Sequence, residues 1–223
     1  MTTAAGTPAA RPIHRRLALG IGPASLVVAD VATLGFITLG FEMVASRILT
    51  PLFGSGIFTW ATIISIVVAG LMAGYFLGGI IADRFPDFGL AAVIKLVAAG
   101  YLLMVFALTA GGLESLINMI DGEITALFAS GMVICFPPLV VLGMYSPLSV
   151  RLLLLEPTDA GKISGGLFAI SSFGNIVGIL VTTFFLIPAI GTRAITAGFA
   201  GFLVVSGAIS VAAAVMRGPR QES

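Results

Sequence analysis

Residues 41–85 read FEMVASRILTPLFGSGIFTWATIISIVVAGLMAGYFLGGIIADRF, and this stretch decides the fold. It holds two apolar runs separated by a turn that contains Pro51 and Gly56. The second run, about residues 58–82, is long enough to cross a hydrocarbon core of roughly 30 Å as a helix. It ends at Asp83 and Arg84, a charged pair that fits a membrane surface. The stretch therefore predicts two membrane spans joined by a tight turn.

The composition of all 223 residues points to the same class of protein. Hydrophobic residues make up 58% of the chain and charged residues only 9%, and the mean hydropathy is +1.15. A soluble domain carries about 25% charged residues, so this chain cannot cover a soluble surface. The formal net charge of +1 and the lack of a basic patch argue against a nucleic-acid partner. We expect an all-α, multi-pass protein of the cell (inner) membrane whose main partner is the lipid bilayer.

Apolar runs and turn residues predict six transmembrane helices. The expected spans are about residues 23–47, 58–82, 89–110, 124–148, 163–187 and 192–216. Pro137 and Pro138 should kink the fourth span, because each removes a backbone donor and crowds the preceding turn. Residues 1–16 are expected to form a disordered cytoplasmic tail, residues 17–216 the six-helix domain and residues 217–223 a second cytoplasmic tail.

The basic residues predict the orientation of the spans, since cytoplasmic loops are enriched in Lys and Arg. With the N-terminus inside, nine of the 11 basic residues fall on the inner side and only Arg47 and Arg193 on the outer side. The nine include Lys95, which we expect to snorkel towards the inner surface from the start of the third span. Both termini are therefore expected in the cytoplasm.

Three charged residues fall inside or beside the first span. Asp30 is expected roughly 10 Å into the helix, either as a proton or cation site or as a hydrated residue if the span starts later. Glu42 and Arg47 lie near the outer end and about 140° apart around a helix, so they are poorly placed to pair. Charges in hydrocarbon are costly and often mark a pathway, whereas Arg47 at the interface can simply snorkel.

Two spans carry regularly spaced glycines. Gly70, Gly74 and Gly78 recur every fourth residue in the second span, which favours close packing by another helix. In the fifth span, Gly174 and Gly178 are interleaved with a polar face that includes Asn175. Asn175 is interpreted either as a residue that hydrogen-bonds to another helix or as a substrate contact.

The segment from Gly79 to Arg84 has the pattern G-x-x-x-D-R at the inner end of the second span. It resembles the motif that major facilitator transporters carry between their second and third spans, although Phe85-Pro86-Asp87 replaces the Gly and basic pair of that family. The resemblance implies that Asp83 and Arg84 pair with neighbouring helix ends and form a cytoplasmic latch. Six spans would form half of a major facilitator bundle.

Two longer blocks recur together and in order. The first is E-x-x-x-x-R-x-L-x-P-x-F-G from Glu42 to Gly54, followed by Trp60 and GGIIADR. The second is LGMYSPLSVRLLL at residues 142–154 and GKISGGLFAISSFGNIVGILVTTFFLIPAIGTR at residues 161–193. Together they resemble the membrane domain of spermidine synthase-like integral membrane proteins. That family commonly adds a cytoplasmic aminopropyltransferase-like domain, whose glycine-rich nucleotide loop is absent from these 223 residues, so we expect no enzyme activity and no cofactor.

The leading hypothesis is a transporter, or half of one, for a polyamine or a related small cationic solute. Asp30, Glu42, Arg47 and Asn175 would line the substrate or ion pathway, and a homodimer formed through the glycine faces would supply the second half. The alternative is a non-catalytic scaffold that docks a separate synthase-like enzyme on its inner loops. An integral enzyme for a lipid-soluble substrate ranks last, because the sequence has no His or Cys cluster, metal-ligand spacing or nucleophile-base pair.

Overall fold

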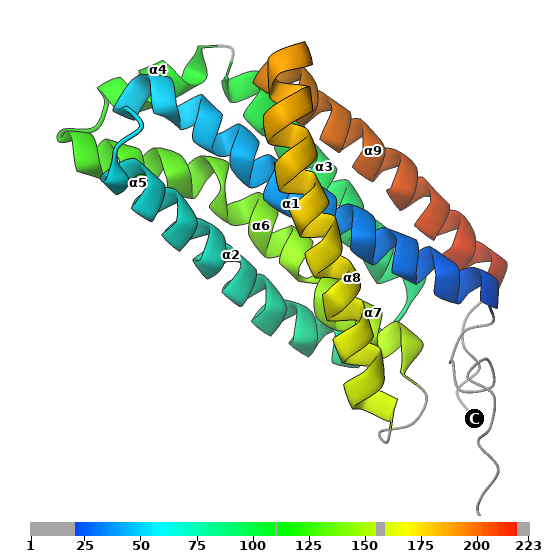
Figure 1. The fold of residues 1–223 in the computed structure, drawn as a ribbon. Coiled ribbons are helices and arrows are strands. Elements are labelled where there is room, and N and C mark those ends of the chain that lie inside the picture. The colour runs from blue at the N-terminus through cyan, green and yellow to red at the C-terminus, as the bar shows by residue number, and fades with distance from the viewer. Residues whose placement is uncertain (1–20, 110, 155–158, 218–223) are drawn as a thin grey trace, which may run out of the picture.

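The computed structural model describes residues 21–109, 111–154 and 159–217, and within them the chain is a bundle of helices (Figure 1). The helices are α1 (Ile21–Phe53), α2 (Ile57–Arg84), α3 (Phe88–Leu108), α4 (Gly112–Asn118), α5 (Glu123–Ile134), α6 (Phe136–Gly143), α7 (Tyr145–Leu153), α8 (Ala160–Val181), the π-helical turn η3 (Thr182–Leu186) and α9 (Ile187–Arg217). The predicted tails, residues 1–16 and most of 217–223, lie outside the described residues.

The chain is a multi-pass membrane protein. Five continuous helical stretches are long and apolar enough to cross a membrane, and the last of them, Ala160–Met216, has 57 residues. Gly191 interrupts this stretch with φ 76 and ψ 164, so α9 runs back along the bundle against α3 while α8 packs on α1 (Figure 1). The parts of this stretch before and after Gly191 each cross once, so the five stretches make six crossings in total, which agrees with the prediction. The beginning of α1 and the end of α9 accordingly lie at the same end of the bundle (Figure 1).

Glycine and aspartate residues define the turns between crossings. Gly54, with φ 77, ends the first crossing in a left-handed conformation that a side chain would disfavour. Asp87 caps α3, because its Oδ1 accepts a hydrogen bond of 2.7 Å from the Leu90 backbone N–H. These local signals make the turns short, but the closest packing joins helices that are not consecutive: α1 with α8, α3 with α9 and α2 with α6.

The fourth crossing is broken into three helices, as its prolines predict. Pro137 has no N–H to donate to the carbonyl four residues earlier, that of Val133. The hydroxyl of Tyr101, on α3, donates a hydrogen bond of 2.7 Å to this carbonyl instead. The helix restarts as α6 and again as α7 at Tyr145, two residues before Pro147. A kink that would leave a polar group unsatisfied in hydrocarbon is therefore compensated by a neighbouring helix.

The glycines of the second crossing lie where α2 meets the fourth crossing. A Cβ on Gly74 would lie 2.3 Å from the Val140 carbonyl oxygen, and one on Gly78 would lie 2.5 Å from the Cα of Met144. Gly70 is buried on the same face of α2. Only glycine permits the backbones of these helices to approach so closely.

The glycines of the fifth crossing lie where α8 meets α1. A Cβ on Gly174 would lie 2.1 Å from the Ala32 carbonyl oxygen, and one on Gly178 would lie 2.3 Å from the Phe36 carbonyl oxygen. Both glycine faces are therefore buried within a single copy of the chain. The expectation that they form the interface with a second copy is wrong, because a partner helix of the same chain already occupies each face.

Candidate functional site

An acid and a base meet in the interior of the bundle. Asp30 lies in the third turn of α1 and is 5% exposed, and Lys95, in the second turn of α3, is 0% exposed. The Lys95 ammonium donates a hydrogen bond to the Asp30 carboxylate and forms an ion pair with it. The expectation that Lys95 snorkels to the inner surface is thus wrong, because its charge is satisfied inside the protein. The alternative that Asp30 is hydrated is also wrong, since its side chain is enclosed.

Two further helices complete this cluster. Ser206 on α9 donates a hydrogen bond of 2.8 Å to Oδ1 of Asp30, and the hydroxyl of Tyr145 on α7 donates one of 3.0 Å to Oδ2. Lys95 donates a hydrogen bond of 2.8 Å to Oγ of Ser210, and its Nζ lies 5.3 Å from the centre of the Tyr145 ring. Both carboxylate oxygens are satisfied, so the pair can remain buried in a low-dielectric interior. The cluster joins α1, α3, α7 and α9.

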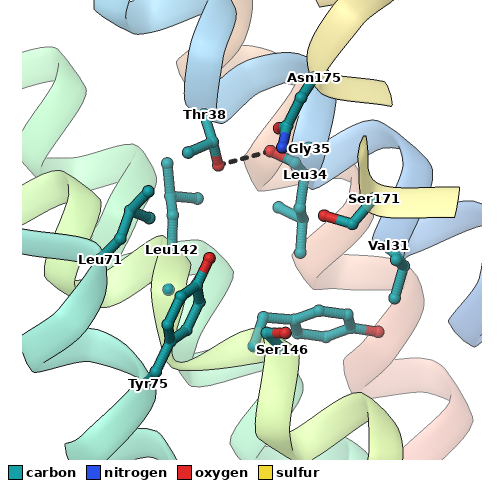
Figure 2. A pocket seen from close by; sticks show the side chains of 12 residues that line it. Val31, Leu34, Gly35, Thr38, Leu71, Tyr75, Leu142, Ser146, Ser171 and Asn175 are labelled. Carbon is teal, nitrogen blue, oxygen red and sulfur yellow. Dashed lines mark hydrogen bonds between the residues drawn. The ribbon is translucent and has the colours of Figure 1, made fainter. Parts of the chain in front are cut away.

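A small polar pocket lies beside the cluster (Figure 2). Its volume is about 40 Å³, and its polar lining comes from Thr38, Tyr75, Ser146, Ser171 and Asn175. These residues belong to α1, α2, α7 and α8, and Figure 2 shows them arranged around a common open space. At about 10–15 Å³ for each water, the pocket has room for roughly three waters.

Tyr145 connects the pocket to the ion pair. Its side chain lines the pocket, and its hydroxyl donates to Asp30. Val31, the residue after Asp30, lines the same pocket. Tyr145 is therefore the residue that contacts both the pocket and the buried carboxylate.

Asn175 lines the pocket, but its side-chain oxygen has almost no accessible surface. Its Oδ1 is buried and has no hydrogen-bond partner among the described residues. A Cβ on Gly35 would lie 3.2 Å from this oxygen, so α1 closely covers one side of it. Within the described residues Asn175 therefore does not join two helices through Oδ1, and its role as a ligand contact stays a prediction.

The four predicted pathway residues do not form one site. Asp30 belongs to the ion-pair cluster and Asn175 to the neighbouring pocket. Glu42 lies about 18 Å further along α1 and is 9% exposed, and the part of the chain that the structure describes supplies no hydrogen bond or ion pair to it. Arg47 is exposed and lines a separate cavity at the far end of α1. Glu42 and Arg47 are not paired with each other, in keeping with their predicted separation around the helix.

The predicted latch residues lie at the end of the bundle that the sequence places inside. Nε of Arg151, in the last turn of α7, donates a hydrogen bond of 2.7 Å to Oδ1 of Asp83 at the end of α2. Their side chains are 48% and 63% exposed, so the pair stabilises the fold by no more than about 1 kcal/mol. Arg84 is exposed beside it, and no acid among the described residues forms an ion pair with it.

Sequence reasoning missed the partners of Asp30, and one signal could have found Lys95. Asp30 lies nine residues into α1 and Lys95 seven residues into α3, two helices that enter from the same end of the bundle. At 1.5 Å per residue their depths differ by only about 3 Å. An acid and a base at one depth in hydrocarbon are expected to pair. Tyr145 and the two α9 serines carried no comparable signal.

These features define an α-helical, multi-pass membrane protein with a buried ion pair next to a small polar pocket. Comparisons with protein-family models, with curated proteins and with solved structures find no match. The resemblance to spermidine synthase-like membrane domains therefore stays a prediction. Among the residues that the structure describes, no group of three or more His, Cys, Asp or Glu side chains could hold a metal ion.

Proposed function

We propose that this chain is a transporter, or half of one, that carries a small cationic solute through the pocket next to Asp30. The observation that carries the proposal is the contact of Tyr145 with both the pocket and Asp30. Ionisable groups buried inside a membrane bundle are costly, and they typically serve ion or substrate pathways. An enclosed carboxylate beside a polar pocket is suited to an ammonium group, such as either end of a polyamine.

The charge of the cluster sets a condition on this transport. Lys95 already neutralises Asp30, so a second ammonium would leave one uncompensated positive charge in the bundle. That charge is removed if Lys95 releases a proton to water as one ammonium of the solute binds Asp30, while any other ammonium of the solute stays in contact with water. Binding and proton release are then coupled, and the solute exchanges for a proton. When the solute leaves, Lys95 takes up a proton again and re-forms the ion pair.

The pocket must widen for this cycle, because about 40 Å³ accommodates waters but not a diamine. The closed state is supported on the inner side by the contact between Asp83 and Arg151, which joins α2 to α7. Both helices line the pocket, through Tyr75 and Ser146. Separation of α2 from α7 would break the latch and open the pocket together.

The test is uptake of labelled putrescine and spermidine into liposomes that contain the purified protein, with and without a pH gradient. We expect uptake above protein-free liposomes, and we expect Tyr145→Phe to reduce it because the hydroxyl that contacts Asp30 is lost. Tyr101→Phe is the matched control, since its hydroxyl binds a backbone carbonyl outside the pocket. The absence of uptake by the folded wild type would contradict the proposal and favour the scaffold for a synthase-like partner.

A further inference from the structure

A second polar cavity lies at the opposite end of α1 from the ion pair. Its volume is about 270 Å³, and its charged lining consists of Arg47, Glu114 and Arg193. Two arginines and one glutamate leave one net positive charge. No ion pair joins either arginine to an acid within the described residues, Glu114 included. Thr109 and Thr192 also line the cavity, and the Thr109 hydroxyl donates a hydrogen bond of 2.9 Å to the Phe106 carbonyl.

The two arginines are held on different helices. Arg47 lies in the last two turns of α1. Arg193 follows the Gly191 break, and its Cζ lies 4.7 Å from the centre of the Phe106 ring on α3. This contact orients the Arg193 guanidinium by a cation–π interaction. Each guanidinium offers several N–H donors in a planar fork, a geometry that suits the oxygens of a phosphate group.

A separate apolar groove, which shares no lining residue with this cavity, lies further into the hydrocarbon region. Its volume is about 340 Å³, and it is lined by α1, the end of the fifth crossing and α9. On α9, Arg193 lines the cavity and the next residue, Ala194, lines the groove. On α1, Ile48 lines the cavity and Ile37 the groove; eleven residues are about three turns, so both lie on one face, roughly 16 Å apart.

The groove is open on the side that faces lipid. Ile190 is 55% exposed and Phe202 is 48% exposed, and both line the groove. The cavity lies at helix ends, where the headgroups of a bilayer are found, and the groove extends toward the bilayer centre. One face of the protein thus offers a cationic site and an apolar channel in the order in which a phospholipid carries its phosphate and its acyl chain.

We propose that this face binds an anionic phospholipid, with its phosphodiester between Arg47 and Arg193 and one acyl chain in the groove. The single negative charge of such a lipid balances the net positive charge of the cavity. Phosphatidylcholine carries the same phosphate but adds a quaternary ammonium, so its net charge is zero and it binds more weakly. The site is separate from the pocket beside Asp30, and the proposal does not depend on transport.

Native mass spectrometry of the purified chain, with phosphatidylglycerol and phosphatidylcholine in competition, tests the proposal. We expect phosphatidylglycerol to be preferred, and Arg47→Gln or Arg193→Gln each to weaken its binding roughly tenfold or more through loss of charge-assisted hydrogen bonds. Arg84→Gln is the matched control, because it removes an exposed arginine at the other end of the bundle. This control should leave the binding of phosphatidylglycerol almost unchanged.

A second variant separates the acyl chain from the headgroup. Gly198 lines the groove, and open space surrounds its Cβ position, so Gly198→Leu fills the groove without a clash at Cβ. We expect this variant to weaken lipid binding several-fold while leaving the weak binding of soluble glycerophosphate unchanged. Equal binding of the two lipids, equal losses in the Arg84 control, or competition by glycerophosphate as effective as that by the lipid would each overturn the proposal.

Discussion

Removal of the Lys95 ammonium should destabilise the protein far more than removal of any one hydrogen bond in the cluster. Lys95→Met keeps a long apolar side chain but leaves Asp30 enclosed without its cation. Loss of one partner of a buried ion pair costs about 3–5 kcal/mol, because the remaining charge is uncompensated or must be neutralised by a proton. A hydrogen bond between helices in a membrane protein contributes about 0.6 kcal/mol on average and at most about 1.7 kcal/mol. Ser206→Ala should therefore lower the free energy of unfolding much less than Lys95→Met does.

The assay is reversible unfolding of the purified protein in mixed detergent micelles, with Lys162→Met as control, since Lys162 is exposed near the start of α8. The double variant Asp30→Asn/Lys95→Met should be much more stable than the sum of its two single variants implies, because neither charge then stays buried alone. A Lys95→Met variant as stable as Lys162→Met, or strictly additive effects in the double variant, would refute a buried pair.

Three further substitutions test separate parts of the structure. Gly174→Ala should lower the free energy of unfolding by about 1–3 kcal/mol through overpacking, because its Cβ would lie 2.1 Å from a backbone carbonyl of α1. Gly201→Ala is the control: open space surrounds its Cβ, so it should be neutral in the same unfolding assay. Tyr101→Phe should lower the free energy of unfolding by about 1 kcal/mol in the wild type. The loss should be smaller in a Pro137→Ala background, because a restored backbone N–H can then bind the freed α5 carbonyl. Equal losses in the two backgrounds would show that the tyrosine acts elsewhere. Glu42→Gln should unfold at the same or a higher denaturant concentration than the wild type, since this enclosed carboxyl lacks a partner among the described residues; if it also abolishes uptake while folding is intact, Glu42 lies on the solute path.

The sequence predicted the membrane class, the six crossings and the break in the fourth crossing. These features depend on local signals, such as the length of an apolar run or a proline within it, which the tertiary structure does not override. The positions of Gly74 and Gly174 at close helix contacts also follow from local spacing. The identity of the helix that packs on each glycine face does not follow from local spacing. A glycine face accepts a helix of the same chain as readily as one from a second copy.

The burial of Lys95 shows why the candidate site was harder to predict than the fold. Hydropathy gives the depth of a residue along its span but not the direction in which it points around the helix. The third span is apolar on every side, so no pattern indicated that Lys95 faces the bundle interior. Its burial depends on Asp30 and on the α9 serine Ser210, which are distant in sequence. Depth matching could have suggested the pair, but the contact of Tyr145 with the polar pocket required the structure.

Proton release on addition of putrescine to proteoliposomes with an entrapped pH indicator tests the exchange at Asp30 most directly. The wild type should move protons out of the lumen as labelled putrescine enters, with similar numbers of each. The double variant Asp30→Asn/Lys95→Met, once its folding has been verified, has neither the carboxylate nor the ammonium and should show neither flux. Putrescine entry without proton movement, or equal fluxes in the wild type and the double variant, would contradict transport through the buried ion pair.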